Sequence, residues 1–469
     1  MARRVSEDLI RLLSRDKVID DPDIVRLYAR EPSGISSEAL AVVFPENVRD
    51  VSKIASYAYK NNVPVYPQGS TTDLVGGAVP EPSGIIVSFE RMNKIVNVNI
   101  LDSTVDVEVG VRLGDLNVEL AKHGYMFPID PASVNIATVG GAINSGAGGL
   151  RGAKYGTMRD WVLRLTIVLP DETGTIMNVG CRTTKCRQGY DLVRLIVGSE
   201  GTLALVAEAT LKIAPLPETM ATALAFFPTL ENLFEAYREI KSSGVQPLIM
   251  EFMDHETAKL AGEASKSPIN VEGHMLLVSV DCNFEAVERI ESWLRGVMEK
   301  NGAVKVYTSK TIEGAEPLFT IRRSLFPAQV AIASELYPGR KKIVFMDDIA
   351  VPPSKILEAV KVIKSVSEEK GLKVSIGGHI GDGNLHPSVA FPLDDDTIKK
   401  KVLEWEFEIS KIAVELGGTV SAEHGIGLRK KEFLRMEMEK LGSVKALEIM
   451  KGVKKIFDPK GILNPGKVV

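Results

Sequence analysis

Residues 137–156 read ATVGGAINSGAGGLRGAKYG, and the interpretation of the whole chain starts from this glycine-rich stretch. Glycine lets main-chain N–H groups come close to a ligand, and a concave run of N–H groups suits an anion such as a pyrophosphate. A flexible surface loop is the alternative for such a sequence. Ile136, Val139 and Ile143 are interleaved with the glycines, which favours a packed segment over a solvated one.

A second cluster of glycines and hydroxyl residues lies upstream, in PQGSTTDLVGG at residues 67–77. It follows a short predicted strand at 63–66, which is the order that a phosphate-binding loop requires. It lacks the Gly-Lys-Ser/Thr of a P-loop and the GxGxxG of a dinucleotide fingerprint. The two clusters together indicate a phosphate-containing ligand, although neither would do so alone.

Composition limits the class of protein. The 469 residues predict two to three domains, and a net charge of −4 argues against nucleic acid as the main partner. No apolar run reaches the roughly 18 residues that cross a bilayer. The first residues, MARRVSEDLIRLLSRD, have no apolar signal region and predict an amphipathic helix.

The chain has three cysteines, Cys181, Cys186 and Cys282. They are too few for a disulfide framework and are not spaced as CxxC, so they fit a reducing compartment and exclude a cysteine-bound iron–sulfur cluster within this chain. A Cys181–Cys186 pair, or a metal bound with outside help, is the alternative. Ordinary buried or half-buried thiols are the prediction.

Hydrophobic patterns divide the chain into two textures around Pro215–Pro217. Before it, we predict a strand at 85–88, a hairpin of 96–100 with 105–109, and a helix from Leu113 to Gly124. After it, strands alternate with helices predicted at 230–243, 284–301, 354–370, 395–416 and 430–452. This pattern predicts an α+β fold, an antiparallel sheet with helices on one face.

A second candidate site uses histidine. Residues 377–386 read GGHIGDGNLH and residues 421–427 read SAEHGIG, and they hold three of the six histidines. His379, His386 and Glu423 predict a divalent metal site for Zn, Mn or Fe, with His424 as a general base. Surface-loop or satisfied core histidines are the alternative.

The motifs in this order resemble the vanillyl-alcohol-oxidase (PCMH-type) superfamily, in its glycolate oxidase and D-lactate dehydrogenase branch. The resemblance covers residues 41–217 and 218–469. It is carried by VFPENVRDV, PVYPQGSTTDLVGG, residues 130–163, GYDLVRLIVGSEGTLALVAEATLKIAP, GGHIGDGNLHP, AEHGIGLRKK and FDPKGILNPGK. It implies an N-terminal helical segment at 1–37, a two-subdomain FAD-binding domain at 38–217, a ferredoxin-like substrate domain with the metal site at 218–455, and a C-terminal return to the FAD domain at 456–469.

The resemblance also implies which residues contact FAD. They are Pro67, Gln68, Gly69, Ser70, Thr71, Thr72, Asp130, Thr138, Gly140, Gly141, Asn144, Gly148, Tyr155, Gly156, Glu200, Gly201 and Asn464. Many relatives have Arg where this chain has Gln68, which predicts weaker binding of the diphosphate. No His or Cys occupies the positions where some relatives tether the flavin, so the expected FAD is non-covalent.

For the second site the resemblance implies the roles already listed for His379, His386, Glu423 and His424. It adds an Arg that holds the substrate carboxylate. In LFTIRRSLF that residue is Arg322, with Arg323 as its rival and a surface helix charge as the alternative for either. Relatives that oxidise D-2-hydroxyglutarate carry a Lys where this chain has Met346, which argues against a dicarboxylic substrate.

The implied reaction is the oxidation of a D-2-hydroxy acid, of D-lactate or glycolate type, to the 2-oxo acid. Two alternatives are a flavin-dependent ether-lipid synthase and an FAD-carrying subunit of a larger glycolate oxidase complex. The expected electron acceptor is external: a quinone, a cytochrome or electron-transferring flavoprotein. We expect a homo-oligomer in the cytoplasm, or one peripheral on the inner face of the membrane, with no nucleic-acid partner.

Overall fold

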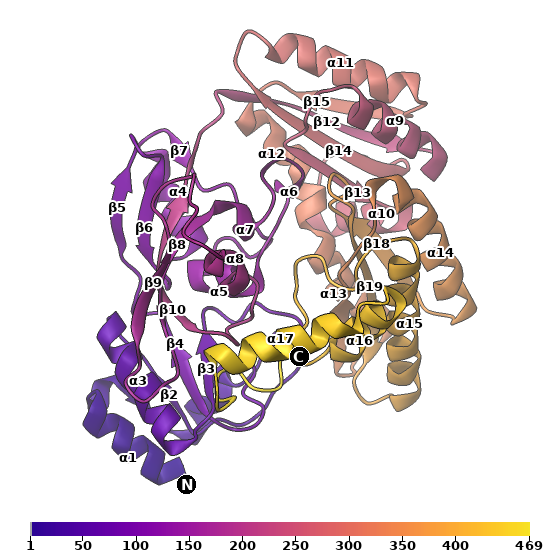
Figure 1. Ribbon diagram of the computed structural model, residues 1–469. Coiled ribbons are helices and arrows are strands. Elements are labelled where there is room, and N and C mark those ends of the chain that lie inside the picture. Colours follow the sequence, from indigo (N-terminus) through magenta and orange to yellow (C-terminus); the bar gives the residue numbers. More distant parts are fainter. Residues whose placement is uncertain (1) are drawn as a thin grey trace. The chain divides into compact units, whose positions relative to one another are not determined.

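A computed structural model describes residues 2–469 and divides the chain into two compact units (Figure 1). Unit 1 comprises Met1–Gly148, Thr157–Leu216 and Glu423–Val469. Unit 2 comprises Gly149–Gly156 and Pro217–Ala422. Both units combine helices with sheets, so the predicted α+β class is confirmed.

Unit 1 is built on two sheets. The first has the strand order β1(Val18–Ile19)-β2(Ala41–Val43)-β4(Ile85–Ser88)-β3(Val65–Gln68), and β2, β4 and β3 run parallel. The second is antiparallel, in the order β5(Ile95–Asn99)-β6(Thr104–Glu108)-β10(Leu205–Lys212)-β8(Val162–Val168)-β9(Ile176–Gly180). The predicted strand at 85–88 and the predicted hairpin are therefore confirmed. A short ribbon pairs β7(Tyr125–Met126) with β11(Ala214–Pro215).

One hydrophobic core joins both sheets to the helices of unit 1. Helix α3 (Val48–Asn61) shows why: Val51, Ile54, Ala55 and Ala58 recur at helical spacing and are all fully buried. The side chain of Asn47 caps the amide of Asp50 at its start. The other helices of unit 1 are α1(Ala2–Leu12), α2(Pro22–Tyr28), α4(Leu113–Ala121), α5(Val139–Ser145), α7(Met158–Trp161), α8(Leu192–Ile196), α16(Lys431–Lys440) and α17(Val444–Phe457).

Unit 2 is organised by one antiparallel sheet. Its order is β15(Lys305–Ser309)-β12(Thr219–Phe227)-β14(His274–Cys282)-β13(Ile249–Met253)-β18(Val374–Gly378)-β19(Asn384–Pro392)-β16(Lys342–Met346), with β17(Ile349–Ala350) also paired to β19. The helices are α6(Gly152–Tyr155), α9(Leu230–Ser242), α10(His255–Ser265), α11(Val287–Lys300), α12(Ile312–Arg323), α13(Leu325–Leu336), α14(Ile356–Glu369) and α15(Asp396–Glu415).

The expectation that helices cover only one face of this sheet is wrong. Ala223 and Phe227 of β12 belong to a core with α9, α11, α14 and α15, whereas Leu224 and Phe226 belong to a second core with α10, α12 and α13. Alternate residues of a strand point to opposite faces, and all nine residues of β12 are buried. Such a strand requires a covered sheet on both sides.

Three further expectations are corrected. The helix predicted at 430–452 is two helices, α16 and α17, because Gly442 takes a φ of +63° between them. Cys181 and Cys186 are not thiols but a disulfide with a Cα–Cα distance of 5.8 Å, a separation that the five-residue spacing in a loop allows. Ile136 is 52% exposed, although Val139 and Ile143 are fully buried as predicted.

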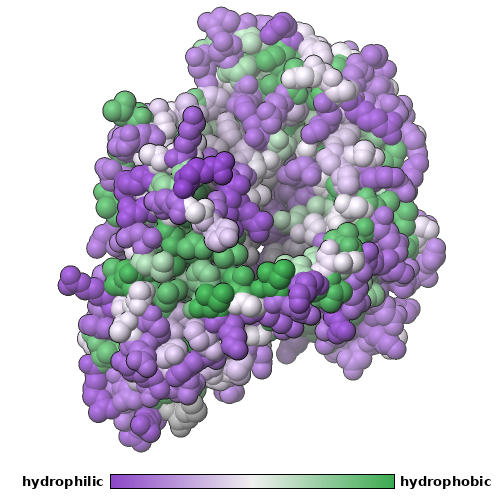
Figure 2. Space-filling model, in the orientation of Figure 1, coloured by the Kyte–Doolittle hydropathy of each residue, from purple (hydrophilic) through white to green (hydrophobic). Residues whose placement is uncertain are grey.

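Helix α17 gives unit 1 an apolar outer surface. No residue of this helix is buried, and Ile449, Met450 and Ile456 are 60, 38 and 78% exposed. Figure 2 shows hydrophobic surface in the region where Figure 1 draws α17 in yellow. After α17 the chain returns to β3, where Leu463 forms a parallel bridge with Val65.

The helices of both units are too short or too polar to span a lipid bilayer. Among the helices of residues 2–469, none combines the length and the apolar content that a bilayer crossing requires.

Candidate functional site

A cavity of about 850 Å³ in unit 1 collects residues from both glycine-rich clusters. Strand β3 ends at Gln68, and the loop after it contributes Gly69, Ser70 and Thr71 to the wall. Thr138 faces them from the start of α5, where its side chain caps the amide of Gly141 at 3.2 Å. The sequence prediction that the two clusters form one site is supported for these five residues by this shared cavity.

Gly69 shows why glycine is required in this loop. A Cβ added there would lie 2.2 Å from Thr138 Oγ1 and 3.5 Å from the Cα of Gly141. A side chain at this position would therefore push the loop away from α5. The bare backbone keeps the two loops together at the wall of the cavity.

The cavity wall and two unsatisfied side chains outside it, Asn144 and Ser199, fit a dinucleotide. Asn144 Oδ1 and Ser199 Oγ are buried without a hydrogen-bond partner among the described residues. Buried polar atoms are rarely left unsatisfied, so both atoms are available to a ligand beside the glycine-rich segment. The backbone of the loop at Gly69–Thr71 lines the cavity and can add N–H donors for phosphate, whereas the first amides of α5 already donate to protein oxygens.

Gln68 does not supply the positive charge of the arginine that the resemblance implies at this position. Its Nε2 donates to the main-chain carbonyls of Tyr28 and Ala78 at 2.8 and 2.9 Å, and the residue is 2% exposed. Arg112, which precedes α4 and is exposed, lines the same cavity. Arg112 therefore provides a positive charge in the cavity wall. The sequence did not predict it as a site residue.

Other predicted cofactor residues brace the surrounding loops. Asn464 Nδ2 donates to the carbonyls of Gly77 and Glu200 at 2.7 and 2.6 Å. The Glu200 carboxylate accepts from the amides of Ile426 and Gly427. Among the described residues, the remaining predicted ones do not line the cavity: Pro67, Thr72, Asp130, Gly140, Gly141, Asn144, Gly148, Tyr155, Gly156 and Gly201. Tyr155 and Gly156 belong to unit 2, where Tyr155 packs on a hydrophobic core.

Three carboxylates near these loops are shielded from solvent: Glu31 and Glu200 are buried, and Asp73 is half-buried. Burial raises the pKa of Glu31 to about 8, with a further rise from the charge of Asp73. Burial likewise raises the pKa of Glu200 to about 7 and that of Asp73. Buried acids favour the neutral form when desolvation exceeds the help from hydrogen bonds, so unit 1 holds protons that the unfolded chain would release.

A buried ionic group defines the candidate site in unit 2. Glu251 lies in the middle of β13, between the core residues Ile249 and Met253 on the same face, and has no exposed surface. Arg322, near the end of α12, donates through Nε to Glu251 Oε2 at 2.5 Å. His379, directly after β18, places Nδ1 at 2.7 Å from Glu251 Oε1.

His386 occupies the neighbouring strand β19. Its ring centroid lies 5.1 Å from that of His379, with the planes at 85°. Its Nδ1 is 3.3 Å from the carbonyl of Asp347 and 4.0 Å from Asp348 Oδ1. A carbonyl and an ionised carboxylate accept hydrogen bonds, so the neutral tautomer that fits these contacts would donate through Nδ1 in both histidines.

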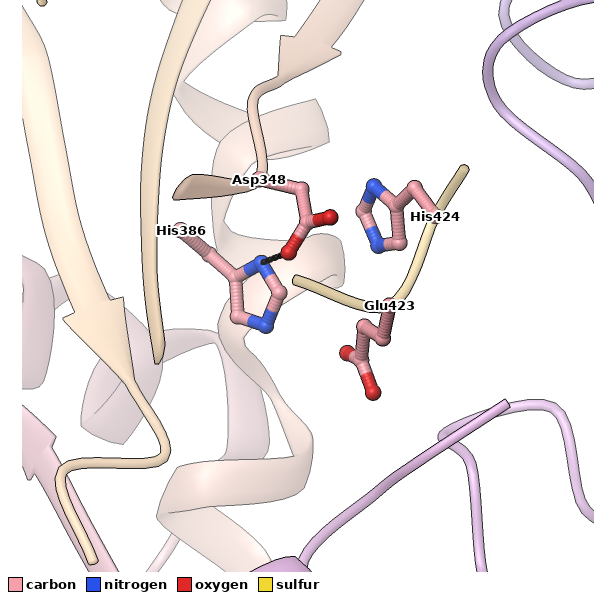
Figure 3. A group of neighbouring side chains, drawn as sticks. All are labelled: Asp348, His386, Glu423 and His424. Carbon is pink, nitrogen blue, oxygen red and sulfur yellow. Dashed lines mark ion pairs between the residues drawn. The ribbon is translucent and has the colours of Figure 1, made fainter. Parts of the chain in front are cut away.

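Asp348 organises the segment that carries Glu423 and His424. Its Oδ2 accepts from Ser421 Oγ at 3.0 Å and from the amide of Ala422 at 2.8 Å, and Glu423 and His424 follow directly in the chain. Asp348, His386, Glu423 and His424 each offer one ligand atom, and these atoms lie within 4.8 Å of one another (Figure 3). Nitrogen and carboxylate donors in this set fit a divalent transition metal; the set shares His386 and Glu423 with the predicted one and contains Asp348 and His424 but not His379.

The two candidate arginines differ in burial. Arg322 is 8% exposed, so it is not a surface helix charge. The side chain of Arg323 is 55% exposed and pairs with Glu316. Burial beside the histidines favours Arg322 over Arg323.

Sequence reasoning missed Glu251 and the contacts of Asp348. Both are acids within apolar stretches, IMEFM and VFMDDIA, and an acid in a buried strand requires a partner. The sequence alone therefore indicated that each of these acids has a partner.

Known protein families match both the N-terminal and the C-terminal part of the chain. Residues 39–180 match the model of an FAD binding domain, and residues 216–468 match that of the C-terminal domain of FAD linked oxidases. Glycolate oxidase subunit GlcD of Bacillus subtilis (strain 168) is 35% identical over 472 residues, which cover 100% of this chain and 97% of the relative. D-lactate dehydrogenase of Archaeoglobus fulgidus is 36% identical over 438 residues, 92% of each chain.

A solved structure extends the comparison to the fold. p-Cresol methylhydroxylase with substrate bound superimposes with a TM-score of 0.78 over 99% of this chain and 96% of the other, at 16% identity. This likeness confirms the PCMH-type fold and carries no information on substrate.

Proposed function

The chain belongs to the FAD-linked oxidases, and from this membership we propose that it oxidises a small D-2-hydroxy acid to the corresponding 2-oxo acid. It is an FAD-dependent oxidoreductase. One observation carries the substrate class: a buried arginine and two histidines, whose Nδ1 atoms face acceptor oxygens, lie in one small region of unit 2. A cation for a carboxylate and ligands for a metal are what a 2-hydroxy acid requires.

The carboxylate of the substrate would bind Arg322. Its Nε already donates to Glu251, so the Nη1–Nη2 edge of the guanidinium is the edge for a second, bidentate carboxylate. Orientation by this contact and by the hydroxyl group fixes which face of the substrate carbon is presented, which is the basis for selecting one enantiomer.

The hydroxyl group would lie at the histidines. His379, His386 and Glu423 would hold a divalent metal, Zn, Mn or Fe, which supplies a Lewis acid that lowers the pKa of an alcohol. His424, beside Glu423 in the chain, would accept the hydroxyl proton, since histidine is the most frequent general base. FAD, bound without a covalent link in unit 1, supplies the acceptor for the hydride. Asp348 holds the Ser421–Ala422 backbone that carries Glu423 and His424.

The expected substrate is a small monocarboxylic acid. Two of the similar proteins are named for glycolate and D-lactate. Met346, the last residue of β16, is uncharged and half-buried against a core of unit 2. A second carboxylate would need a cation, and this position does not provide one.

The electrons must leave through a partner. One relative is named as a subunit, so we propose that the chain works within a larger complex or delivers electrons to a quinone, a cytochrome or an electron-transferring flavoprotein. A position on the inner face of the membrane suits the first two acceptors.

The test is a substrate panel. Purified flavin-loaded protein is mixed with D- and L-2-hydroxy acids and an artificial electron acceptor, with and without a chelator. We expect dye reduction with D-lactate or glycolate, little with L-lactate, and a loss with the chelator that Zn²⁺, Mn²⁺ or Fe²⁺ restores. No reduction with any 2-hydroxy acid would overturn the proposed function.

A further inference from the structure

Glu251 has two partners with different tasks in the proposed reaction. One oxygen of its carboxylate accepts from the substrate-binding candidate Arg322 at 2.5 Å, and the other lies 2.7 Å from the ring of the ligand candidate His379. The three residues come from β13, α12 and the loop after β18. We infer that Glu251 is the positioning residue that fixes the carboxylate anchor and the metal ligand relative to each other; this rests on the proposed function.

The electrostatics of the group support a fixed arrangement. Glu251 has no exposed surface, and the side chain of Arg322 is 10% exposed. A buried carboxylate without a partner is strongly disfavoured, so the pair holds both side chains in place. His379 faces Glu251 through Nδ1, which is the arrangement by which a carboxylate orients a metal-binding imidazole.

The surrounding strands leave Glu251 little freedom. Glu251 pairs with Leu277 of β14, and the next residue, Phe252, pairs with Gly378 of β18, the residue before His379. The backbone that carries His379 is therefore hydrogen-bonded to the backbone that carries Glu251. The sheet sets their separation, and Arg322 is added from the helix that packs on this face.

The consequence is a rule for substrate choice. When one carboxylate fixes both anchors, the spacing between the bound carboxylate and the hydroxyl group is fixed as well. A 2-hydroxy acid would match this spacing and a 3-hydroxy acid would not. Loosening Glu251 should therefore lower metal affinity and reduce the preference for 2-hydroxy over 3-hydroxy acids.

The experiment compares Glu251→Gln, Glu251→Asp and Arg322→Met with the wild type. Zn²⁺ affinity is measured by competition with a chromophoric chelator, on flavin-loaded protein without substrate. We expect Glu251→Gln to lose 10- to 100-fold in Zn²⁺ affinity, Glu251→Asp to lose less, and Arg322→Met to keep its Zn²⁺ affinity while its KM rises. FAD content should not change in any of them.

Glu291→Gln is the matched control. Glu291 is also buried, at 6% exposure, and pairs with Arg295 and Thr308 on α11 and β15. It should bind Zn²⁺ as the wild type does. If Glu251→Gln does not fold, the double variant Glu251→Gln with Arg322→Met removes the unpaired cation, and its Zn²⁺ affinity should still be reduced relative to Arg322→Met.

The outcomes separate the two claims. Wild-type Zn²⁺ affinity in Glu251→Gln, or in the double variant, would overturn the positioning role even if the enzyme oxidises 2-hydroxy acids. A wild-type protein that oxidises none of them would overturn the proposed function, while the Zn²⁺ titrations would still decide whether Glu251 positions His379.

Discussion

The two candidate sites of this chain are built from opposite materials. In unit 1, the cavity wall is formed largely by loop backbone and small side chains, with Gly69 so close to Thr138 that no Cβ fits. In unit 2, the site consists of polar and charged side chains, Glu251, Arg322 and His379, joined at 2.5 and 2.7 Å. A cofactor that is retained through many turnovers suits preorganised backbone, whereas a substrate that must be oriented and deprotonated requires side-chain chemistry.

The largest effect should come from His424, because it separates chemistry from cofactor binding. We expect His424→Ala to lower kcat by about 10²–10⁴-fold, because the hydroxyl proton loses its acceptor. The yellow flavin spectrum should stay unchanged. Stopped-flow measurement of flavin bleaching by D-lactate checks this, and bleaching at the wild-type rate would remove His424 as the base.

The buried acid Glu200 should give unit 1 a pH-dependent stability. Its pKa is about 7 in the folded chain against an ordinary 4.5, so the folded form keeps a proton that the unfolded form releases. This stabilisation is complete below about pH 4.5 and is lost as the pH rises through about 7, a change of about 3 kcal/mol. Lys467, with a pKa lowered by burial to about 8, titrates above this window.

The measurement is guanidinium unfolding between pH 5 and 7. The wild type should lose stability as the pH rises, and Glu200→Gln should show a flatter profile. Parallel profiles for the two proteins would show that Glu200 does not hold this proton.

A side chain at Gly69 should weaken FAD binding and leave metal binding unchanged. Gly69→Ala forces Thr138 Oγ1 away from 2.2 Å, and we expect FAD affinity to fall by about 10- to 100-fold, since overpacking costs about 1–3 kcal/mol. Zn²⁺ affinity should be unchanged. Gly296→Ala is the control, because a Cβ at this α11 position meets nothing within 4 Å. Equal FAD affinity in both variants would contradict the backbone account of the cavity.

The smallest expected effect is at Arg112, the cation in the cavity wall. Arg112→Gln should weaken FAD binding by about tenfold, the value of one charge-assisted hydrogen bond of about 1.5 kcal/mol. Fluorescence titration of the apoprotein with FAD measures it. A salt dependence equal to that of the wild type would show that Arg112 does not contact the diphosphate.

The contrast between the sites also explains what the sequence could predict. Backbone sites leave a compositional signal, so the loop at Gly69 and the segment from Thr138 onward were predicted to bind phosphate; the loop and Thr138 line the cavity, whereas the glycines after Thr138 do not. The histidines were visible because only six exist. Glu251 and Asp348 were not selected, since an acid within an apolar stretch of sequence does not show which distant side chain it will meet.

Local signals were misleading elsewhere. Pro317 and Pro327 suggest breaks, and helices α12 and α13 were not predicted around them. Gly442 was included in a helix that its positive φ ends. Helices α10, α12 and α13 cover the second face of the unit 2 sheet. Because these helices were not predicted, the cover on this face was not predicted either.

The central claim is that FAD is held by unit 1 independently of a metal held by His379, His386 and Glu423, and that turnover requires both. The most direct measurement is anaerobic mixing of D-lactate or glycolate with flavin-loaded protein, before and after removal of the metal by a chelator. We predict rapid flavin bleaching in the metal-loaded protein, and full FAD retention without bleaching in the metal-free protein until Zn²⁺, Mn²⁺ or Fe²⁺ is returned. Equal bleaching rates in the two samples would contradict this account.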